Sequence, residues 1–198
     1  MNLFARIISF ISNPVLLSIP FSYALVFKSR EDFLYALAWT FVSILFASLV
    51  GVFVVLAVRK GVFSDFDISK RQERTPIFIF TGLLSILYFL IVFLLNGPKV
   101  LLIALGALLF GVIIADIINR KIKASIHLAV FSSFSVIMGI LYGGIFWALL
   151  LIAPLVAWSR VKLKKHEPLE TIVGGLVGII IVLMLYVVVK YVLGFYAK

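Results

Sequence analysis

The sequence predicts an all-α, polytopic transmembrane helix bundle of six to seven helices, forming a single membrane domain over residues 1–198. Two observations predict it. Of the 198 residues, 64% are hydrophobic and 13% are charged, with a mean hydropathy of +1.26, whereas soluble domains are about 45–50% apolar and about one quarter charged. Long uncharged runs also alternate with short charged clusters. A soluble globule, a disordered chain and a collagen-like fibre are therefore excluded, and the absence of cysteine excludes a disulfide framework and thiolate-bound metal.

Residues 7–119 contain three uncharged runs and a fourth run with a single acid, Asp116, near its end; about 17–25 helical residues are needed to cross the hydrocarbon core. Pro14 and Pro20 make the first run irregular, and its beginning could lie along the membrane interface. The turn sequence Asn96-Gly97-Pro98 separates the last two runs. No secretory cleavage pattern stands out, so we expect the N-terminal segment to be retained. The four predicted spans are Ile7–Phe27, Phe33–Val58, Ile77–Leu95 and Val100–Asn119.

The second half contains one uncharged stretch of ambiguous length, Leu128–Ser159, with 32 residues. As one helix it would be about 48 Å long and would overshoot the bilayer. Tyr142-Gly143-Gly144 lies near its midpoint, which predicts two short spans joined by a tight turn. Thr171–Val189 is the last predicted span. Its Gly174 and Gly178 indicate close helix packing rather than a phosphate-binding loop.

The formal net charge is +10, from 18 Lys and Arg against 8 Asp and Glu. Three polar clusters separate the spans: Arg59–Arg74, Arg120–His127 and Arg160–Glu170. Two spans lie between successive clusters, so all three clusters are predicted on one membrane face. Thirteen basic residues and both histidines of the chain fall on that face, and the positive-inside rule places it in the cytoplasm.

This basic face has three possible explanations: topology, contact with anionic lipid headgroups, or binding of a phosphorylated ligand. A soluble nucleic-acid binder is excluded despite the isoelectric point near 10.0, because the basic residues are distributed between hydrophobic spans. The expected surroundings are the bilayer of a cell membrane. The run Lys162–Lys165 is typical of headgroup contact rather than catalysis.

The third cluster carries the most specific chemistry. His166 and Glu170 are four residues apart and would share a helix face. Pro168 suits the first turn of a helix, which places His166 near a helix N-terminus, where free N–H groups favour a phosphate. A carboxylate bonded to one imidazole nitrogen leaves the other as base or nucleophile.

This segment resembles the third motif of the type-2 phosphatidic acid phosphatase superfamily, S-R-x5-H-x3-D, with Ser159, Arg160 and His166 matching and Glu170 replacing the Asp. Lys123-Ala124-Ser125-Ile126-His127 is similar to the second motif, P-S-G-H, without its Pro and Gly. The first motif, K-x6-R-P, is reduced to Arg74 with Pro76, and Asp67 stands where its Lys belongs. The chain is thus identified as a divergent member, with a catalytic core over residues 59–178.

The resemblance implies a lipid phosphatase acting on a phosphomonoester or diphosphate of a phospholipid or polyprenyl lipid, with no cofactor or metal. It also implies a site on the outer side of the membrane, whereas the positive-inside rule places the basic face in the cytoplasm. His166 would attack phosphorus and form a phosphohistidine, Glu170 would orient its ring, and His127 would protonate the leaving oxygen and later activate water. The phosphoryl oxygens would be held by Arg160, Arg74, Arg71 or Lys123, and Ser125.

Two rival hypotheses remain open. Asp65-Phe66-Asp67 could bind Mg²⁺ and a diphosphate in a prenyltransferase-type enzyme, although only Asp116 is available as a further acid of that face. The altered first motif and Glu170 also fit a degenerate family member that binds or moves a lipid phosphate without hydrolysing it. Asp116 itself is expected to form an ion pair with Arg120, one helical turn away.

Overall fold

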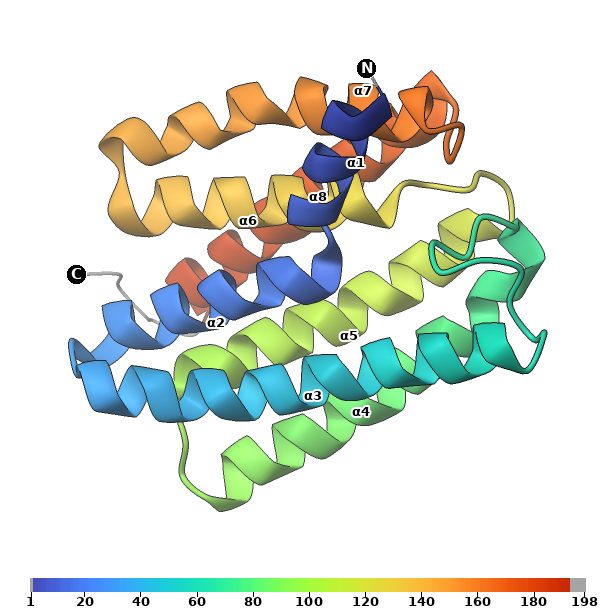
Figure 1. Ribbon diagram of the computed structural model, residues 1–198. Helices are drawn as coiled ribbons and strands as arrows, with labels where there is room; N and C mark the ends of the chain where they lie inside the picture. Colours follow the sequence, from blue (N-terminus) through green and yellow to red (C-terminus); the bar gives the residue numbers. More distant parts are fainter. Residues whose placement is uncertain (1, 193–198) are drawn as a thin grey trace. The chain divides into compact units, whose positions relative to one another are not determined.

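The computed structural model describes residues 2–192 and is all-helical over that range, with no strand (Figure 1). Its eight α-helices are α1 (Asn2–Ile11), α2 (Pro14–Arg30), α3 (Phe33–Arg59), α4 (Arg74–Leu94), α5 (Lys99–Asn119), α6 (Ile126–Tyr142), α7 (Ala153–Lys162) and α8 (Pro168–Val187). Two short 3₁₀ segments, η1 (Arg71–Glu73) and η2 (Gly144–Ile152), precede α4 and α7, and a π-helical turn, η3 (Val188–Val192), follows α8. The predicted fold class is confirmed.

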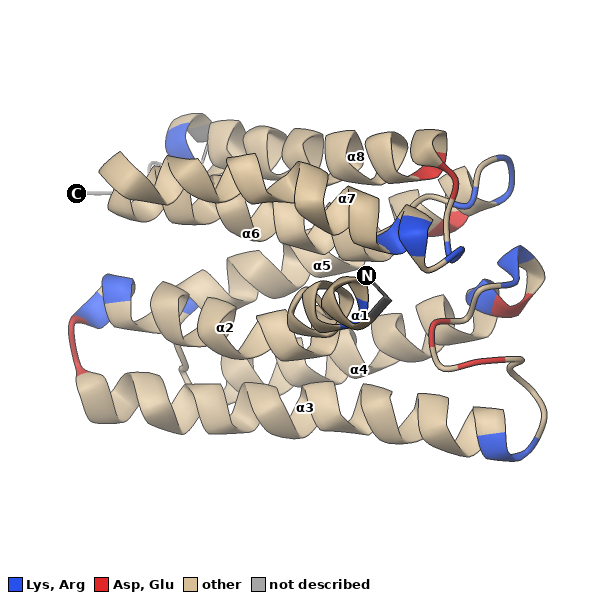
Figure 2. Ribbon diagram, turned by 45° about the horizontal axis from the view of Figure 1, so that its top comes forward, with Lys and Arg blue, Asp and Glu red and all other residues tan. Residues whose placement is uncertain are grey.

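Five helical segments are long and apolar enough to cross a membrane: Phe33–Arg59, Arg71–Leu94, Lys99–Asn119, Gly144–Lys162 and Pro168–Tyr191. The α1–α2 pair adds a sixth if both helices serve one crossing, and α6 is a shorter apolar helix of 17 residues. In Figure 2 most charged residues lie near helix ends and in the connections, and the middles of α2 to α8 are uncharged. The protein is therefore a multi-pass membrane protein.

The chain divides into two compact units. The first comprises the residues up to Pro14 and those from Ala124 onward, and contains α1, α6, η2, α7 and α8. The second, Val15–Lys123, contains α2 to α5. The predicted irregularity of the first hydrophobic run is confirmed, because the helix stops at Ile11 and restarts at Pro14, whereas α2 continues through Pro20.

In the first unit, α6 and α8 pack with their backbones nearly in contact. A Cβ atom built on Gly174 would lie 2.3 Å from the carbonyl oxygen of Ser125, and one on Gly178 would lie 2.1 Å from that of Ala129. Any larger residue at these positions would push the helices apart. The packing role predicted for the two glycines is confirmed.

The predicted break within residues 128–159 is also confirmed. Helix α6 ends at Tyr142, and Gly143 and Gly144 both have positive φ angles, of 66° and 50°, a region that glycine enters without steric cost. The chain then returns through η2 and α7. The indole of Trp147 in η2 lies against Gly139 of α6, where a Cβ atom would come within 2.4 Å of it.

In the second unit, a buried polar cluster links three helices. The Ser43 hydroxyl of α3 contacts the Ser22 hydroxyl of α2 at 2.6 Å and the Tyr88 hydroxyl of α4 at 2.7 Å. The Tyr88 ring also stacks on Phe46, with the ring centroids 4.6 Å apart. Hydroxyl pairs of this kind hold helices together where water is absent.

Candidate functional site

The loop between α7 and α8 places His166 immediately before a helix. Helix α7 ends at Lys162, and Lys164 adopts a positive φ of 56° that reverses the chain. The Lys165 N–H then donates to the carbonyl oxygen of Arg160 at 3.0 Å. Glu167 is the N-cap of α8 and Pro168 its first residue, where the missing proline N–H costs nothing. The predicted place of His166 at a helix N-terminus is confirmed, although it precedes the helix rather than belonging to it.

His166 and Glu170 form a direct contact, with Nδ1 of the imidazole 2.8 Å from Oε2 of the carboxylate. The His166 side chain is 2% exposed and that of Glu170 is 17% exposed. With Nδ1–H donating to the carboxylate, the neutral ring carries its lone pair on Nε2. This is the tautomer that a nucleophile or general base at Nε2 requires.

The start of α6 lies beside the first turn of α8. The Ser125 N–H donates to the carbonyl oxygen of Glu170 at 2.9 Å, and the close approach at Gly174 brings the two backbones together at the same level. His127, two residues further on, is buried in the first turn of α6. The structure thus joins the segments that resemble the second and third phosphatase motifs.

The Ser125 hydroxyl is a buried polar group at the start of α6. Ser125 is the N-cap of α6, yet its side chain makes no capping hydrogen bond. Its Oγ is fully buried and has no hydrogen-bond partner among residues 2–192. A buried hydroxyl without a partner is costly. Its position at a helix N-terminus suits it to a bound anion.

Arg160 is buried in the last turn of α7, with 1% of its surface exposed. Its Nη1 donates to the Ser9 hydroxyl of α1. Phe4 of α1 also packs against Trp158 of α7, with ring centroids 5.9 Å apart. Ser9 lies 151 residues from Arg160 and belongs to no motif, so the sequence alone does not mark it as a site residue.

Three predicted phosphate ligands, Arg71, Arg74 and Lys123, belong to the second unit. Arg71 Nη1 donates to the carbonyl oxygen of Lys121 at 3.0 Å, and the Asn119 amide donates back to the Arg71 carbonyl oxygen at 3.1 Å. Arg74 is buried, and its Nε donates to the carbonyl oxygen of Ile68 at 3.2 Å. These contacts join the first and second polar clusters at one end of this unit. Lys123 is its last residue, next in the chain to the segment that carries Ser125.

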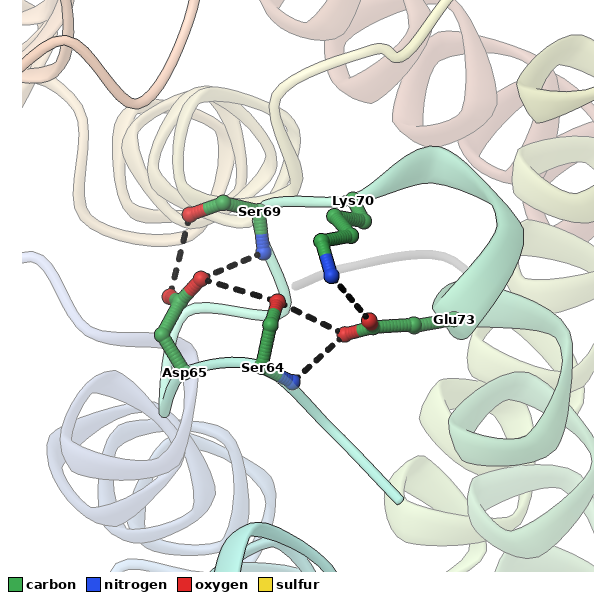
Figure 3. A network of polar contacts seen from close by, with 5 residues as sticks. All are labelled: Ser64, Asp65, Ser69, Lys70 and Glu73. Carbon is green, nitrogen blue, oxygen red and sulfur yellow. Dashed lines mark hydrogen bonds and ion pairs between the residues drawn. The ribbon is translucent and has the colours of Figure 1, made fainter. Parts of the chain in front are cut away.

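The carboxylates of Asp65 and Glu73, in the connection between α3 and α4, are used in hydrogen bonds within that connection (Figure 3). Asp65 Oδ1 accepts from the Asp67 N–H at 2.9 Å and from the Ser69 hydroxyl at 3.0 Å. Glu73 accepts from the Ser64 N–H at 2.7 Å and pairs with Lys70 at 3.3 Å. The part of the chain that the structure describes has no group of three or more His, Asp or Glu residues placed to hold a metal ion.

The predicted ion pair of Asp116 is confirmed. Its Oδ2 lies 3.3 Å from Nη2 of Arg120, one turn further along α5. Its Oδ1 accepts a hydrogen bond from the Thr75 hydroxyl of α4 at 3.1 Å. Oδ1 therefore links α5 to α4, while Oδ2 pairs with the C-cap residue of α5 itself.

Comparisons with known proteins return no matching family model, no matching curated protein and no matching solved structure. The resemblance to the phosphatase motifs therefore rests on individual residues and their spacing, without a match over the length of the chain. The functional assignment rests on the side chains of Ser125, His127, Arg160, His166 and Glu170.

Proposed function

We propose that the protein is a membrane-embedded lipid phosphatase, a divergent member of the type-2 phosphatidic acid phosphatase superfamily. The observation that carries this proposal is the contact of the buried His166 with the partly exposed Glu170, with Nδ1 and Oε2 2.8 Å apart at the start of α8. A carboxylate that fixes one imidazole nitrogen directs the other toward substrate, as in other nucleophile–orienting pairs. The unpartnered Ser125 hydroxyl at the start of α6 adds a donor for a phosphoryl oxygen.

In the proposed reaction, Nε2 of His166 attacks the phosphorus atom in line and forms an N–P bond. The P–O bond to the lipid breaks, and His127 in its protonated form gives its proton to the leaving oxygen. Water then attacks the phosphohistidine while His127 takes up one of its protons. The N–P bond breaks, inorganic phosphate leaves, and both histidines return to their starting state.

Within the first unit, Arg160 would carry most of the charge of the phosphoryl group, with the Ser125 hydroxyl as a further donor. Arg74, Arg71 and Lys123 belong to the second unit, and their phosphate-binding roles stay predictions. Catalysis by such a set consists of positioning and charge stabilisation. The Arg160 guanidinium is already held by Ser9, so little freedom is lost when an anion binds.

A lipid substrate is favoured by the outer surface of α8. Its residues Leu169, Ile172, Leu176, Ile180 and Leu183 are all exposed and follow the three- and four-residue spacing of one helix face. Leu169, the first of them, is 59% exposed and lies three residues after His166. The hydrocarbon-facing surface thus begins within about one helical turn of the proposed nucleophile. A phosphate carried on an acyl or prenyl chain would reach it with the chain still in the membrane.

The test is release of inorganic phosphate by the purified protein from phosphatidate, phosphatidylglycerophosphate and a polyprenyl diphosphate, with and without EDTA. We expect release from at least one of them, and His166→Ala should abolish it. A ³²P label from the substrate should remain on the protein as an acid-labile adduct and be missing from that variant. Lys162→Ala, which changes a basic residue of the same segment without a proposed role, is the matched control. Undiminished release by His166→Ala would refute the nucleophile assignment.

A further inference from the structure

The carboxylate of Glu170 serves two donors through one oxygen atom. Oε2 contacts Nδ1 of His166 at 2.8 Å and accepts from the main-chain N–H of Glu167 at 3.2 Å. The Glu167 carboxylate in turn accepts from the main-chain N–H of Glu170. The two glutamates therefore form a reciprocal capping box, and the imidazole is attached to one member of it.

From this arrangement we propose that Glu167 is a positioning residue of the site: its capping box with Glu170 fixes the carboxylate that orients His166. The inference rests on the proposed function and assigns a role to a residue outside the resemblance to the phosphatase motifs. Glu167 itself is exposed, and its carboxylate accepts from the main-chain N–H of Glu170. It acts through Glu170.

The local chemistry explains why a capping glutamate is needed. The Glu170 side chain is partly exposed and has three rotatable bonds, so without a second contact it would sample several rotamers. The Glu167 N–H holds Oε2 at the point where it meets Nδ1, and the Glu167 carboxylate anchors the backbone from which that side chain extends. At the N-cap, the Glu167 side chain accepts from the N–H of the N3 residue, Glu170, which is the usual donor in a capping box.

The same geometry accounts for Glu in place of Asp at position 170. His166 precedes the N-cap, and the carboxylate has to return past the N-cap N–H to reach the imidazole. An aspartate is one methylene shorter. We infer that this chain uses the longer side chain to combine helix capping with orientation of the histidine, two tasks that are often carried out by separate residues.

The test reads the His166 ring directly, by ¹⁵N spectroscopy of the protein in nanodiscs. The chain has two histidines, so comparison with His127→Gln identifies the His166 signals. In the wild type we expect the neutral tautomer with the proton on Nδ1. Glu167→Ala should mix the two tautomers and lower kcat for phosphate release about tenfold with KM little changed, the size found when a partner that orients a histidine is lost.

Two further variants separate positioning from simple helix stability. Glu167→Ser restores a short N-cap acceptor and should recover the wild-type tautomer, while Glu31→Gln, a change in an exposed glutamate between α2 and α3, should leave it unaltered. An unchanged His166 tautomer in Glu167→Ala overturns the positioning role, whatever the activity or thermal stability. A changed tautomer in a protein that releases no phosphate supports the positioning role and overturns the proposed function.

Discussion

The main-chain N–H of Ser125 donates to the carbonyl oxygen of Glu170 at 2.9 Å, and this bond joins the starts of α6 and α8. The residue whose carboxylate orients His166 is therefore also the backbone contact of the segment that carries His127. Displacement of either helix start would alter both histidine-bearing segments at once. The close backbone packing at Gly174 keeps this bond in place.

Gly174→Ala should destabilise the protein, because its Cβ atom would lie 2.3 Å from the Ser125 carbonyl oxygen. We expect a loss of about 1–3 kcal/mol, the usual cost of overpacking, measured as unfolding in mixed micelles. Gly175→Ala is the matched control, since its Cβ atom would be 3.5 Å from the Ser132 hydroxyl, an ordinary contact. Equal stability of the two variants would contradict the backbone packing described here.

Glu170→Asp should lower phosphate release about tenfold or more, although it restores the residue of the phosphatase motif. The shorter carboxylate would give up either the His166 contact or the Glu167 N–H. Steady-state rates for Glu170→Asp and Glu170→Gln, measured beside the wild type, check this. A gain of activity in Glu170→Asp from an inactive wild type would instead favour a lipid-phosphate-binding protein that has lost catalysis.

Ser9→Ala should weaken substrate binding, because Arg160 would lose the hydroxyl that holds its guanidinium. A hydrogen bond to a charged group contributes about 1.5–3 kcal/mol, so KM for the lipid phosphate should rise several-fold or more. Ser18→Ala is a suitable comparison, since the Ser18 hydroxyl bonds to the Val15 carbonyl oxygen within α2. If KM in Ser9→Ala is as unchanged as in Ser18→Ala, the contact between Ser9 and Arg160 does not contribute to substrate binding.

Asp65→Asn should loosen the α3–α4 loop without creating or removing a metal requirement. Asp65 accepts hydrogen bonds from Asp67 and Ser69, and the amide offers one oxygen where the carboxylate offers two. We expect a lower thermal midpoint and phosphate release that persists in EDTA for both wild type and variant. Activity that requires Mg²⁺ and disappears in Asp65→Asn would support the prenyltransferase alternative.

Hydrophobicity and turn chemistry were sufficient to predict most of the fold. The spans follow from uncharged runs, and the return at Gly143–Gly144 follows from the excess length of residues 128–159 and two adjacent glycines. These signals are local, because the length and polarity of each run are properties of consecutive residues in the sequence. The His166–Glu170 contact was equally accessible, because a four-residue spacing near a helix start brings two side chains together.

Contacts between distant segments were not accessible from the sequence. Ser9 meets Arg160 across 151 positions, and no periodicity or motif marks the serine. The Arg71 side chain donates to the main-chain oxygen of Lys121. Every residue has such an oxygen, so the identity of residue 121 does not indicate this contact.

The 3₁₀ winding of η2 lengthens one candidate membrane crossing. Its nine residues rise about 2.0 Å each, against about 1.5 Å per residue in an α-helix, so the winding adds about 4–5 Å to the span. Differences of a few ångströms also separate the hydrocarbon thickness of different membranes. The 19 residues from Gly144 to Lys162 thus reach farther than an α-helix of the same number of residues, with Arg160 near their far end.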